Sequence, residues 1–345
     1  MIIKNLVRDN VKALKPYASA RQEYINKSDG LVYLDANESP FNNGLNRYPD
    51  PQSVNVKSIL AFQKNIQTEN IFLGNGSDEI LDLIFRVFCE PNKDNIITLP
   101  PTYGMYEVLA SLNAIEIKRV LLNKNFQPQV TEILSIQDEN SKLLFLCSPN
   151  NPTANSFNIE LIDKLLKKFK GIVIVDEAYI DFSQKNSWVS RLAEFPNLIV
   201  IQTLSKAYGL AGIRLGACYA SKYIVSVLNK IKPPYNINQL TQNRALEKLQ
   251  DVTHVYKEIN ILLKEREQLF QQLSKISFVK TIYPSDANFI LVKVDNADKR
   301  YLQLIKKGII VRNRTNQVLC NNCLRFTVGT EIENKRLITI LKQLL

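Results

Sequence analysis

Histidine is almost absent from this chain, and cysteine is scarce and dispersed. The 345 residues contain one histidine, His254, and five cysteines. A structural zinc site usually needs four nitrogen or sulfur ligands, and no second pair accompanies Cys320 and Cys323. The odd number and wide spacing of the cysteines also argue against a disulfide framework. We therefore predict no metal site and no disulfide-stabilised fold.

Long hydrophobic runs are also missing, and we do not expect the first residues to act as a secretory leader. No stretch reaches the roughly 18 consecutive apolar residues that a membrane-spanning helix needs. The first ten residues, MIIKNLVRDN, carry charges where a signal peptide has an apolar run. These two features predict a cytoplasmic protein that has no membrane partner.

The formal net charge is +11, but no block of like charges stands out. The lysines are scattered, and many occupy one face of a predicted helix, as Lys164, Lys167 and Lys168 do. We find no helix-turn-helix or RNA-binding signature that would turn this charge into a nucleic-acid surface. An anionic small substrate explains positive charge in a pocket equally well, so we predict no nucleic-acid partner.

Short apolar runs alternate with helical segments between residues 71 and 220. Such runs are typical of parallel strands that helices cover on both faces. After about residue 235 the sequence changes to a long amphipathic helix followed by shorter elements. We predict an α/β fold with a mostly parallel, helix-covered sheet in a large domain (41–235). A smaller α+β domain would combine 1–40 with 236–345.

The segment 198–216, LIVIQTLSKAYGLAGIRLG, contains the main candidate for catalysis. Its first residues predict a buried strand, and Lys206 follows the end of that strand, where open α/β sheets bind ligands. A lysine amine in a partly apolar pocket can have a lowered pKa and attack carbonyl groups. Ser205 and Arg214 could hold an anion beside it. Taken by itself, a lysine at such a position is more often an ordinary surface lysine, and only the rest of the chain favours the catalytic interpretation.

Other predicted strand ends carry polar residues that suit one particular ligand. Asp176 closes a buried strand and needs a cation or hydrogen-bond donors there. Asn151 and Tyr179 could donate hydrogen bonds, and the glycines of segment 74–78 precede a helix N-terminus that favours an anion. Pyridoxal phosphate has an aldehyde for Lys206, a ring nitrogen, a phenolic oxygen and a phosphate that match these groups.

Eight motifs carry a resemblance to a known family. They occur in the expected order from about residue 6 to the C-terminus, and together they are far more specific than any one of them. Three resemble the fold-type I aminotransferases, and five are similar to the histidinol-phosphate aminotransferases among them. The first three are SPNNPT (148–153), DEAY (176–179) and TLSKAYGLAGIRLG (203–216), and the others are KPYASAR (15–21), LDANE (34–38), RYPD (47–50), PPTYGMY (100–106) and LRFTVGT (324–330).

The resemblance implies a set of contacts to pyridoxal 5′-phosphate. Lys206 would form the Schiff base with the cofactor and move the substrate proton, and Asp176 would pair with the pyridinium nitrogen. The remaining roles would be hydrogen bonds to the phenolic oxygen from Asn151 and Tyr179, ring stacking by Tyr103, and phosphate contacts from Ser77, Asp78, Ser205 and Arg214.

The same resemblance implies a homodimer and a substrate. Tyr48 would reach the cofactor phosphate of the neighbouring subunit. Arg325 and Arg312 would bind the anionic end of the substrate, while Tyr17 and Asn37 would line the pocket. The implied reaction moves the amino group between L-histidinol phosphate and 2-oxoglutarate, giving imidazole acetol phosphate and L-glutamate, a step of histidine biosynthesis.

Three alternatives use the same scaffold. A broad-specificity aromatic amino-acid aminotransferase and a pyridoxal-phosphate decarboxylase of a phosphorylated amino acid share these motifs. A pyridoxal-binding transcription regulator would need a preceding DNA-binding domain, and we do not expect one because the resemblance starts within the first ten residues.

Two positions depart from the family pattern. The first is Ser39 in NESP (37–40), where NENP is commoner. Ala154 follows Asn-Pro-Thr, where the family usually has glycine. If the backbone there requires a positive φ, alanine costs about 1 kcal/mol relative to glycine.

Overall fold

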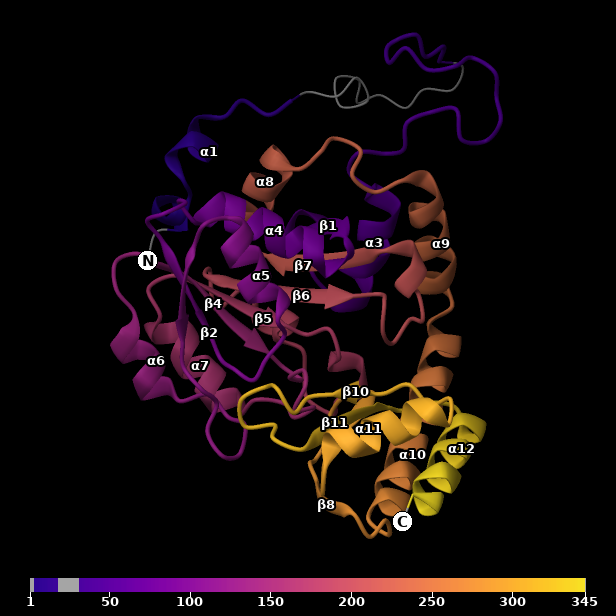
Figure 1. Cartoon of the computed structure of the whole chain (residues 1–345). Coiled ribbons are helices and arrows are strands. Elements are labelled where there is room, and N and C mark those ends of the chain that lie inside the picture. Colours follow the sequence, from indigo (N-terminus) through magenta and orange to yellow (C-terminus); the bar gives the residue numbers. More distant parts are fainter. Residues whose placement is uncertain (1–2, 18–30, 345) are drawn as a thin grey trace.

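A seven-stranded sheet forms the centre of the larger part of the molecule (Figure 1). The computed structural model describes residues 3–17 and 31–344. The strand order is β1-β7-β6-β5-β4-β2-β3; β2 to β6 are parallel, and β7 is antiparallel to both its neighbours. This arrangement confirms the predicted fold class. The strands are β1 (Ile71–Asn75), β2 (Asn95–Thr98), β3 (Glu116–Arg119), β4 (Ser141–Cys147), β5 (Ile172–Asp176), β6 (Leu198–Thr203) and β7 (Leu215–Ala220).

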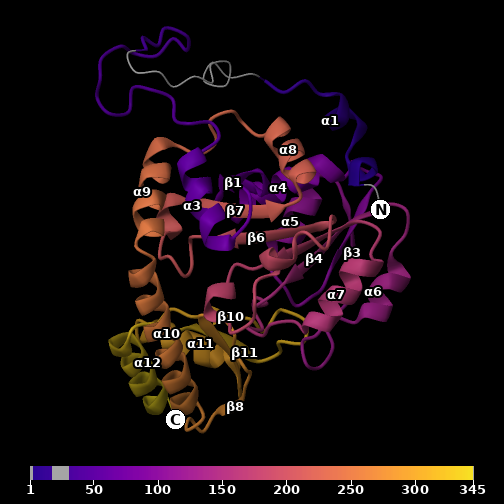
Figure 2. The same ribbon diagram turned by 180° about the vertical axis from the view of Figure 1, so that it is seen from behind.

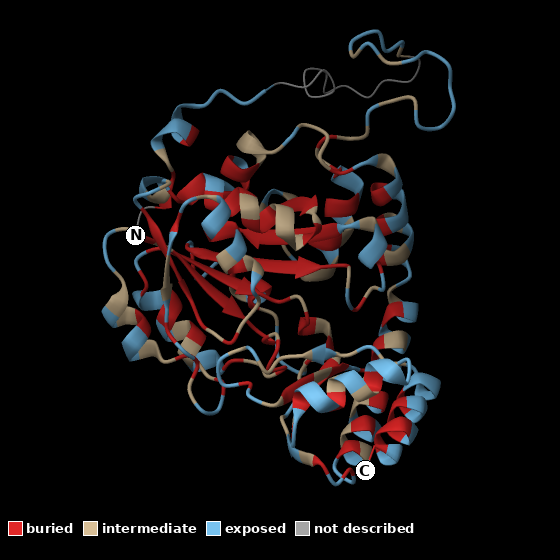
Figure 3. Cartoon of the chain, in the orientation of Figure 1, coloured by how far each residue is buried: buried red, intermediate tan, exposed pale blue. Residues whose placement is uncertain are grey.

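Helices cover both faces of this sheet because its strands are apolar on both sides. Along β5, Ile172 and Ile174 pack into one core, and Val173 and Val175 pack into the other. The strands are accordingly buried throughout the centre (Figure 3). One core includes α4 (Gly76–Phe88), α5 (Met105–Leu112) and α8 (Lys222–Ile231), and the other includes α3 (Val54–Lys64), α6 (Val130–Ile136), α7 (Ile159–Lys168) and α9 (Gln239–Gln250).

The smaller part is an antiparallel sheet of order β10-β11-β9-β8 with its own apolar core. Residues of α10, α11 and α12 share that core, as the predicted α+β domain requires. The elements are α10 (Val252–Leu273), β8 (Val279–Ile282), β9 (Phe289–Val294), α11 (Ala297–Lys306), β10 (Arg312–Asn313), β11 (Cys323–Thr327) and α12 (Glu331–Gln343).

The structure corrects the predicted assignment of the N-terminal segment to the small domain. Ile3, Val7 and Val11 recur every four residues, and all three pack into the large-domain core shared with α4 and α8. Two short helices, η1 (Ile3–Leu6) and α1 (Asp9–Ala13), carry them. At the other boundary, α9 also packs on the large sheet, so the small domain begins at α10.

Residues 31–50 form an arm that stands away from the body of the molecule in two opposite views (Figures 1 and 2). Val32, Leu34 and Phe41 on this arm are each more than four-fifths exposed. At the base of the arm, the ring of Tyr48 stacks on Tyr235 with centroids 4.5 Å apart. The arm therefore exposes apolar side chains that the described residues of this chain leave uncovered.

Candidate active site

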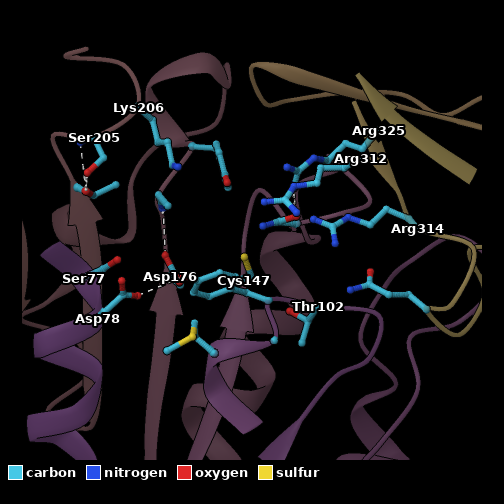
Figure 4. A pocket seen from close by; sticks show the side chains of 18 of the residues that line it. Ser77, Asp78, Thr102, Cys147, Asp176, Ser205, Lys206, Arg312, Arg314 and Arg325 are labelled. Carbon is cyan, nitrogen blue, oxygen red and sulfur yellow. Dashed lines mark hydrogen bonds between the residues drawn. The ribbon is translucent and has the colours of Figure 1, made fainter. Parts of the chain in front are cut away.

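A cavity of about 460 Å³ opens at the carboxyl ends of the parallel strands, where the small sheet faces them. The side chains that line it come from both domains (Figure 4). The cavity collects eleven residues predicted from the sequence: Ser77, Asp78, Tyr103, Asn151, Asp176, Tyr179, Ser205, Lys206, Arg214, Arg312 and Arg325.

Asp176 is the last residue of β5 and is 3% exposed. The Tyr106 hydroxyl donates to its Oδ2 at 2.7 Å, and the Ala178 backbone N–H donates to Oδ1 at 3.1 Å. Burial raises the pKa of the Asp176 carboxyl, and the hydrogen bond from Tyr106 opposes that shift. The carboxylate is thus held by two neutral donors, and among the described residues no lysine or arginine forms an ion pair with it.

Lys206 follows β6 and keeps its amine accessible from the cavity. Burial lowers its pKa first, and the nearby positive charge of Arg325 lowers it further. Its Nζ lies 5.8 Å from the centroid of the Tyr179 ring. The pKa of Tyr179 is raised, mainly by burial, so the phenol remains a hydrogen-bond donor. This environment favours the neutral amine that attacks a carbonyl carbon.

The opposite corner of the cavity has an anion cradle at the start of α4. Gly76 has φ +71°, and its N–H donates to the carbonyl of Arg214 at 2.9 Å. A Cβ on Gly76 would lie 2.6 Å from Nη2 of Arg214, and one on Gly216 would lie 2.5 Å from the Gly76 backbone. Glycine is therefore required at both positions. Arg214 also bonds Asp78 at 3.3 Å, which holds the guanidinium at the helix N-terminus.

Buried hydrogen bonds position the loops around this cradle. Asn150 bonds the hydroxyls of Thr102 and Thr153 at 2.9 and 2.7 Å, and this fixes the loops that carry Tyr103 and Asn151. The Tyr103 hydroxyl donates to Asp78 at 3.1 Å. Thr203 donates to the Ser205 hydroxyl at 3.0 Å.

The other end of the cavity is lined by three arginines of the small sheet. Arg312 and Arg325 are directly opposite each other on β10 and β11. The ladder continues through the Arg314 N–H, which donates to the carbonyl of Cys323 at 2.8 Å. Residues two apart share a face of a strand, so Arg314 joins Arg312 on the cavity side. Among the described residues, none of the three forms an ion pair with a carboxylate.

Sequence reasoning missed Arg314 and Gln317, which line the cavity, and Tyr106, which supports Asp176. Arg312 and Arg314 stand two residues apart, but that spacing alone does not show that their common face meets the cavity. Tyr106 is the last residue of the PPTYGMY motif, but the sequence alone does not show that it lies beside Asp176.

Three predicted residues do not line this cavity. Tyr17 is 75% exposed. Asn37 and Tyr48 line a separate hollow beside the start of α9. The cavity within one chain therefore lacks these three side chains.

Glu177, the residue after Asp176, points away from the cavity into a polar network. Its carboxylate accepts hydrogen bonds from the Ser187 hydroxyl, the Trp188 N–H and the Gln202 amide at 2.6, 2.7 and 2.8 Å. Burial outweighs these donors and raises the pKa of Glu177 to about 7. Glu177 thus ties the ends of β5 and β6 together from behind the site.

The residues present fit pyridoxal 5′-phosphate. A protonated ring nitrogen would give Asp176 an ionic partner, and Ser77, Ser205 and Arg214 line the cavity at the start of α4, where a helix N-terminus favours a phosphate. Lys206 lines the same cavity and lies above Asp176, Ser77 and Asp78 in the view of Figure 4.

Comparison with known proteins identifies the family. The sequence pattern of the class I and II aminotransferases matches residues 34–341. This chain belongs to that family. It is 61% identical to the histidinol-phosphate aminotransferase of Flavobacterium johnsoniae over 343 residues, covering 99% of this chain and 98% of the relative. The corresponding protein of Flavobacterium psychrophilum is 60% identical over 345 residues, covering 99% of each chain.

Solved aminotransferase structures share the fold. The histidinol-phosphate aminotransferase of Clostridium acetobutylicum has a TM-score of 0.80 and 26% identity, covering 87% of this chain and 91% of that one. The Sinorhizobium meliloti enzyme, solved in complex with pyridoxal-5′-phosphate, has a TM-score of 0.78 and 21% identity, covering 87% and 84%. The chain is thus a pyridoxal-phosphate-dependent transaminase. Within the described residues, no helix is long and apolar enough to span a membrane.

Proposed function

We propose that this aminotransferase moves the amino group between L-histidinol phosphate and 2-oxoglutarate in histidine biosynthesis. The observation that carries the proposal is the arginine face formed by Arg312, Arg314 and Arg325, which has no carboxylate partner among the described residues. Such a face suits a substrate with a doubly charged phosphate. The names of relatives at 49–61% identity support the same substrate. The expected cytoplasmic location is part of this proposal.

Each cavity residue then has a chemical task. Pyridoxal phosphate supplies an aldehyde and an electron-withdrawing ring. The Lys206 amine takes the proton from the amine-bearing carbon of the substrate, and burial lowers its pKa in the direction that favours the neutral form. Asp176 holds a proton at the ring nitrogen. Tyr179 and Asn151 orient the phenolic oxygen, and Arg214 with Ser205 holds the phosphate of the cofactor.

Single-turnover absorbance spectra with separate amino donors test the substrate. L-histidinol phosphate and L-glutamate should each convert the cofactor rapidly to its amine form, and L-phenylalanine should react much more slowly. Rapid conversion by phenylalanine alone would favour the aromatic aminotransferase. Release of CO₂ from threonine phosphate without a glutamate half-reaction would favour the decarboxylase, a fold neighbour at 21% identity.

We further propose a homodimer with shared sites. Tyr48, Tyr17 and Asn37 lie outside the cavity of their own chain, and the arm that carries Tyr48 and Asn37 stands away from the body. Its apolar side chains suit burial against a second copy. In this arrangement the arm completes the cofactor cradle of the partner.

Mixed dimers test this sharing. Combining Lys206→Ala with Tyr48→Phe protomers places both lesions in one site and leaves the other intact, so activity should exceed that of either parent. Combining Lys206→Ala with Asp176→Asn is the matched control, because both residues act within their own chain. That mixture should recover nothing. Equal results from the two mixtures would contradict a shared site.

A further inference from the structure

Arg314 lines the arginine face together with Arg312 and Arg325, and it is less exposed than Arg312. Burial lowers its pKa first, and the charge of Arg312 lowers it further. Its Nε is buried without a hydrogen-bond partner among the described residues. A buried, unpaired guanidinium nitrogen is costly, and it occurs here on a side chain that points into the cavity (Figure 4).

Other buried polar atoms near Arg314 also lack hydrogen-bond partners. Nε of Arg325 and Oε1 of Gln317 are also buried and unpaired among the described residues. Arg312 and Arg325 are cross-strand neighbours, and like charges in this position repel each other. Burial and the neighbouring charge of Arg314 lower the pKa of Arg325 to about 10. The local electrostatics therefore favour a ligand of more than one negative charge.

Arg325 and Arg314 differ in their contacts with the cofactor end of the cavity. Arg325 donates to Asn151 Oδ1 at 2.5 Å and stacks over Phe289 at 4.9 Å. Among the described residues, the Arg314 side chain has no hydrogen bond to that end, and its Nε is unpaired. Arg325 is therefore the near cation of the arginine face, and Arg314 is the one without a contact at the cofactor end.

The two substrates place their anions at correspondingly different depths. In glutamate the α-carboxylate is bonded directly to the amine-bearing carbon. In histidinol phosphate a carbon and an oxygen lie between that carbon and the phosphorus. A carboxylate can therefore be held by Arg325, whereas a phosphate extends past it toward Arg314.

We propose that Arg314 is a specificity-determining residue that binds the phosphate of the amino donor. Its guanidinium would pair with the second negative charge of that phosphate. This inference rests on the proposed function, since it assigns a residue to the phosphorylated substrate. It predicts that Arg314 discriminates between the two half-reactions, whereas Arg325 serves both.

Arg314→Gln keeps a polar side chain but removes the charge. We expect kcat/KM for L-histidinol phosphate to fall about 10- to 100-fold, mainly through KM, because a hydrogen bond between charged groups is lost. The glutamate half-reaction should stay within about threefold. Arg314→Lys should recover part of the loss, since lysine keeps the charge without the planar fork. Arg336→Gln, an exposed arginine of α12, is the matched control and should change neither reaction.

The pH dependence of binding separates phosphate recognition from a packing role. A phosphomonoester loses its second proton near pH 6. The affinity of the native enzyme for L-histidinol phosphate should therefore fall as the pH drops from about 7.5 to 5.5, and Arg314→Gln should flatten this dependence. An equal loss for both half-reactions, with the pH profile unchanged, would overturn the proposal.

O-Phosphoethanolamine, an amine with a phosphomonoester, separates this proposal from the substrate assignment. It should inhibit the glutamate half-reaction competitively in the native enzyme and much more weakly in Arg314→Gln. If this difference appears but L-histidinol phosphate is not turned over, the proposed function fails while Arg314 remains a phosphate-binding residue. Equal inhibition of both proteins would contradict the role of Arg314.

Discussion

The two ends of the cavity satisfy their charges in opposite ways. At the cofactor end, Asp176 accepts two hydrogen bonds, and Arg214 already has an ion pair with Asp78. At the substrate end, Arg312 and Arg314 have no carboxylate partner among the described residues. The residues assigned to the cofactor, which stays bound through many turnovers, are thus already held by contacts within the protein. The arginines assigned to the substrate, which leaves in each turnover, have no ionic partner among the described residues.

This contrast has an energetic reason. A guanidinium paired with a carboxylate would have to lose that partner before it could bind a substrate, and affinity would fall by the strength of the pair. Unpaired arginines avoid this competition, but they lower the stability of the small domain through mutual repulsion. The difference predicts that substitutions at the cofactor end damage every reaction, whereas those at the substrate end can be selective.

The largest effect should come from Lys206→Ala. Removal of the amine leaves no base at the amine-bearing carbon, so transamination should fall by about 10³-fold or more. The other contacts of the cofactor end remain, so the protein should still bind pyridoxal phosphate. Stopped-flow spectra of each half-reaction measure the first effect, and equilibrium dialysis of the cofactor measures the second. Near-normal turnover would remove Lys206 from its assigned role.

Asp176→Asn should have the next largest effect. A neutral amide cannot hold a proton at the ring nitrogen. The loss of one partner of a buried charged pair should lower activity about 10²- to 10³-fold. Both kcat and cofactor affinity should fall. If kcat stays at the native value, Asp176 serves only to fix the turn after β5 through Ala178.

Arg325→Ala should reduce kcat/KM roughly 100-fold in both half-reactions, because every bound substrate anion loses one desolvated, positively charged partner. Arg325→Lys should recover only part of this activity. Separate measurements with L-histidinol phosphate and L-glutamate compare the near cation with Arg314. Loss in neither half-reaction would make Arg325 a structural residue.

The smallest expected effect concerns Glu177, behind the cofactor end. Its folded pKa of about 7 lies above the ordinary value of 4.5, so the folded protein holds a proton that the unfolded chain has released. Its contribution to stability is present below about pH 4.5, declines as the pH rises and is lost above about pH 7. Glu177→Gln should remove this part of the pH dependence. Tm measured from pH 5 to pH 8 for both proteins should therefore show a steeper decline in the native enzyme, and parallel curves would contradict a raised pKa.

The sequence indicated the large sheet and the cofactor end because strong local signals mark both. Buried parallel strands are continuous apolar runs, and their polar ends converge wherever such strands pair, so Asp176 and Lys206 could be placed together. Ala154 likewise has the positive φ that the glycine pattern suggested, at 68°. This conformation costs about 1 kcal/mol, which burial of its methyl group partly offsets.

Other features depend on contacts between distant segments and left no local signal. Residues 3–13 form an amphipathic face, but nothing in their sequence shows whether it covers the large or the small sheet. Tyr106 reaches Asp176 across 70 positions. Arg314 became recognisable only when β10 and β11 paired and placed its side chain beside Arg325.

The long helix α10 has a mechanical consequence for this site. Near its start, Val255 and Ile259 pack in the cluster that contains Tyr179 and Phe289, and near its end Leu269 and Leu273 belong to the core of the small sheet. It therefore joins the residues packed around Tyr179 to the core of the small sheet. A substitution that loosens the packing of α10 should thus affect both the cofactor side and the arginine side of the cavity.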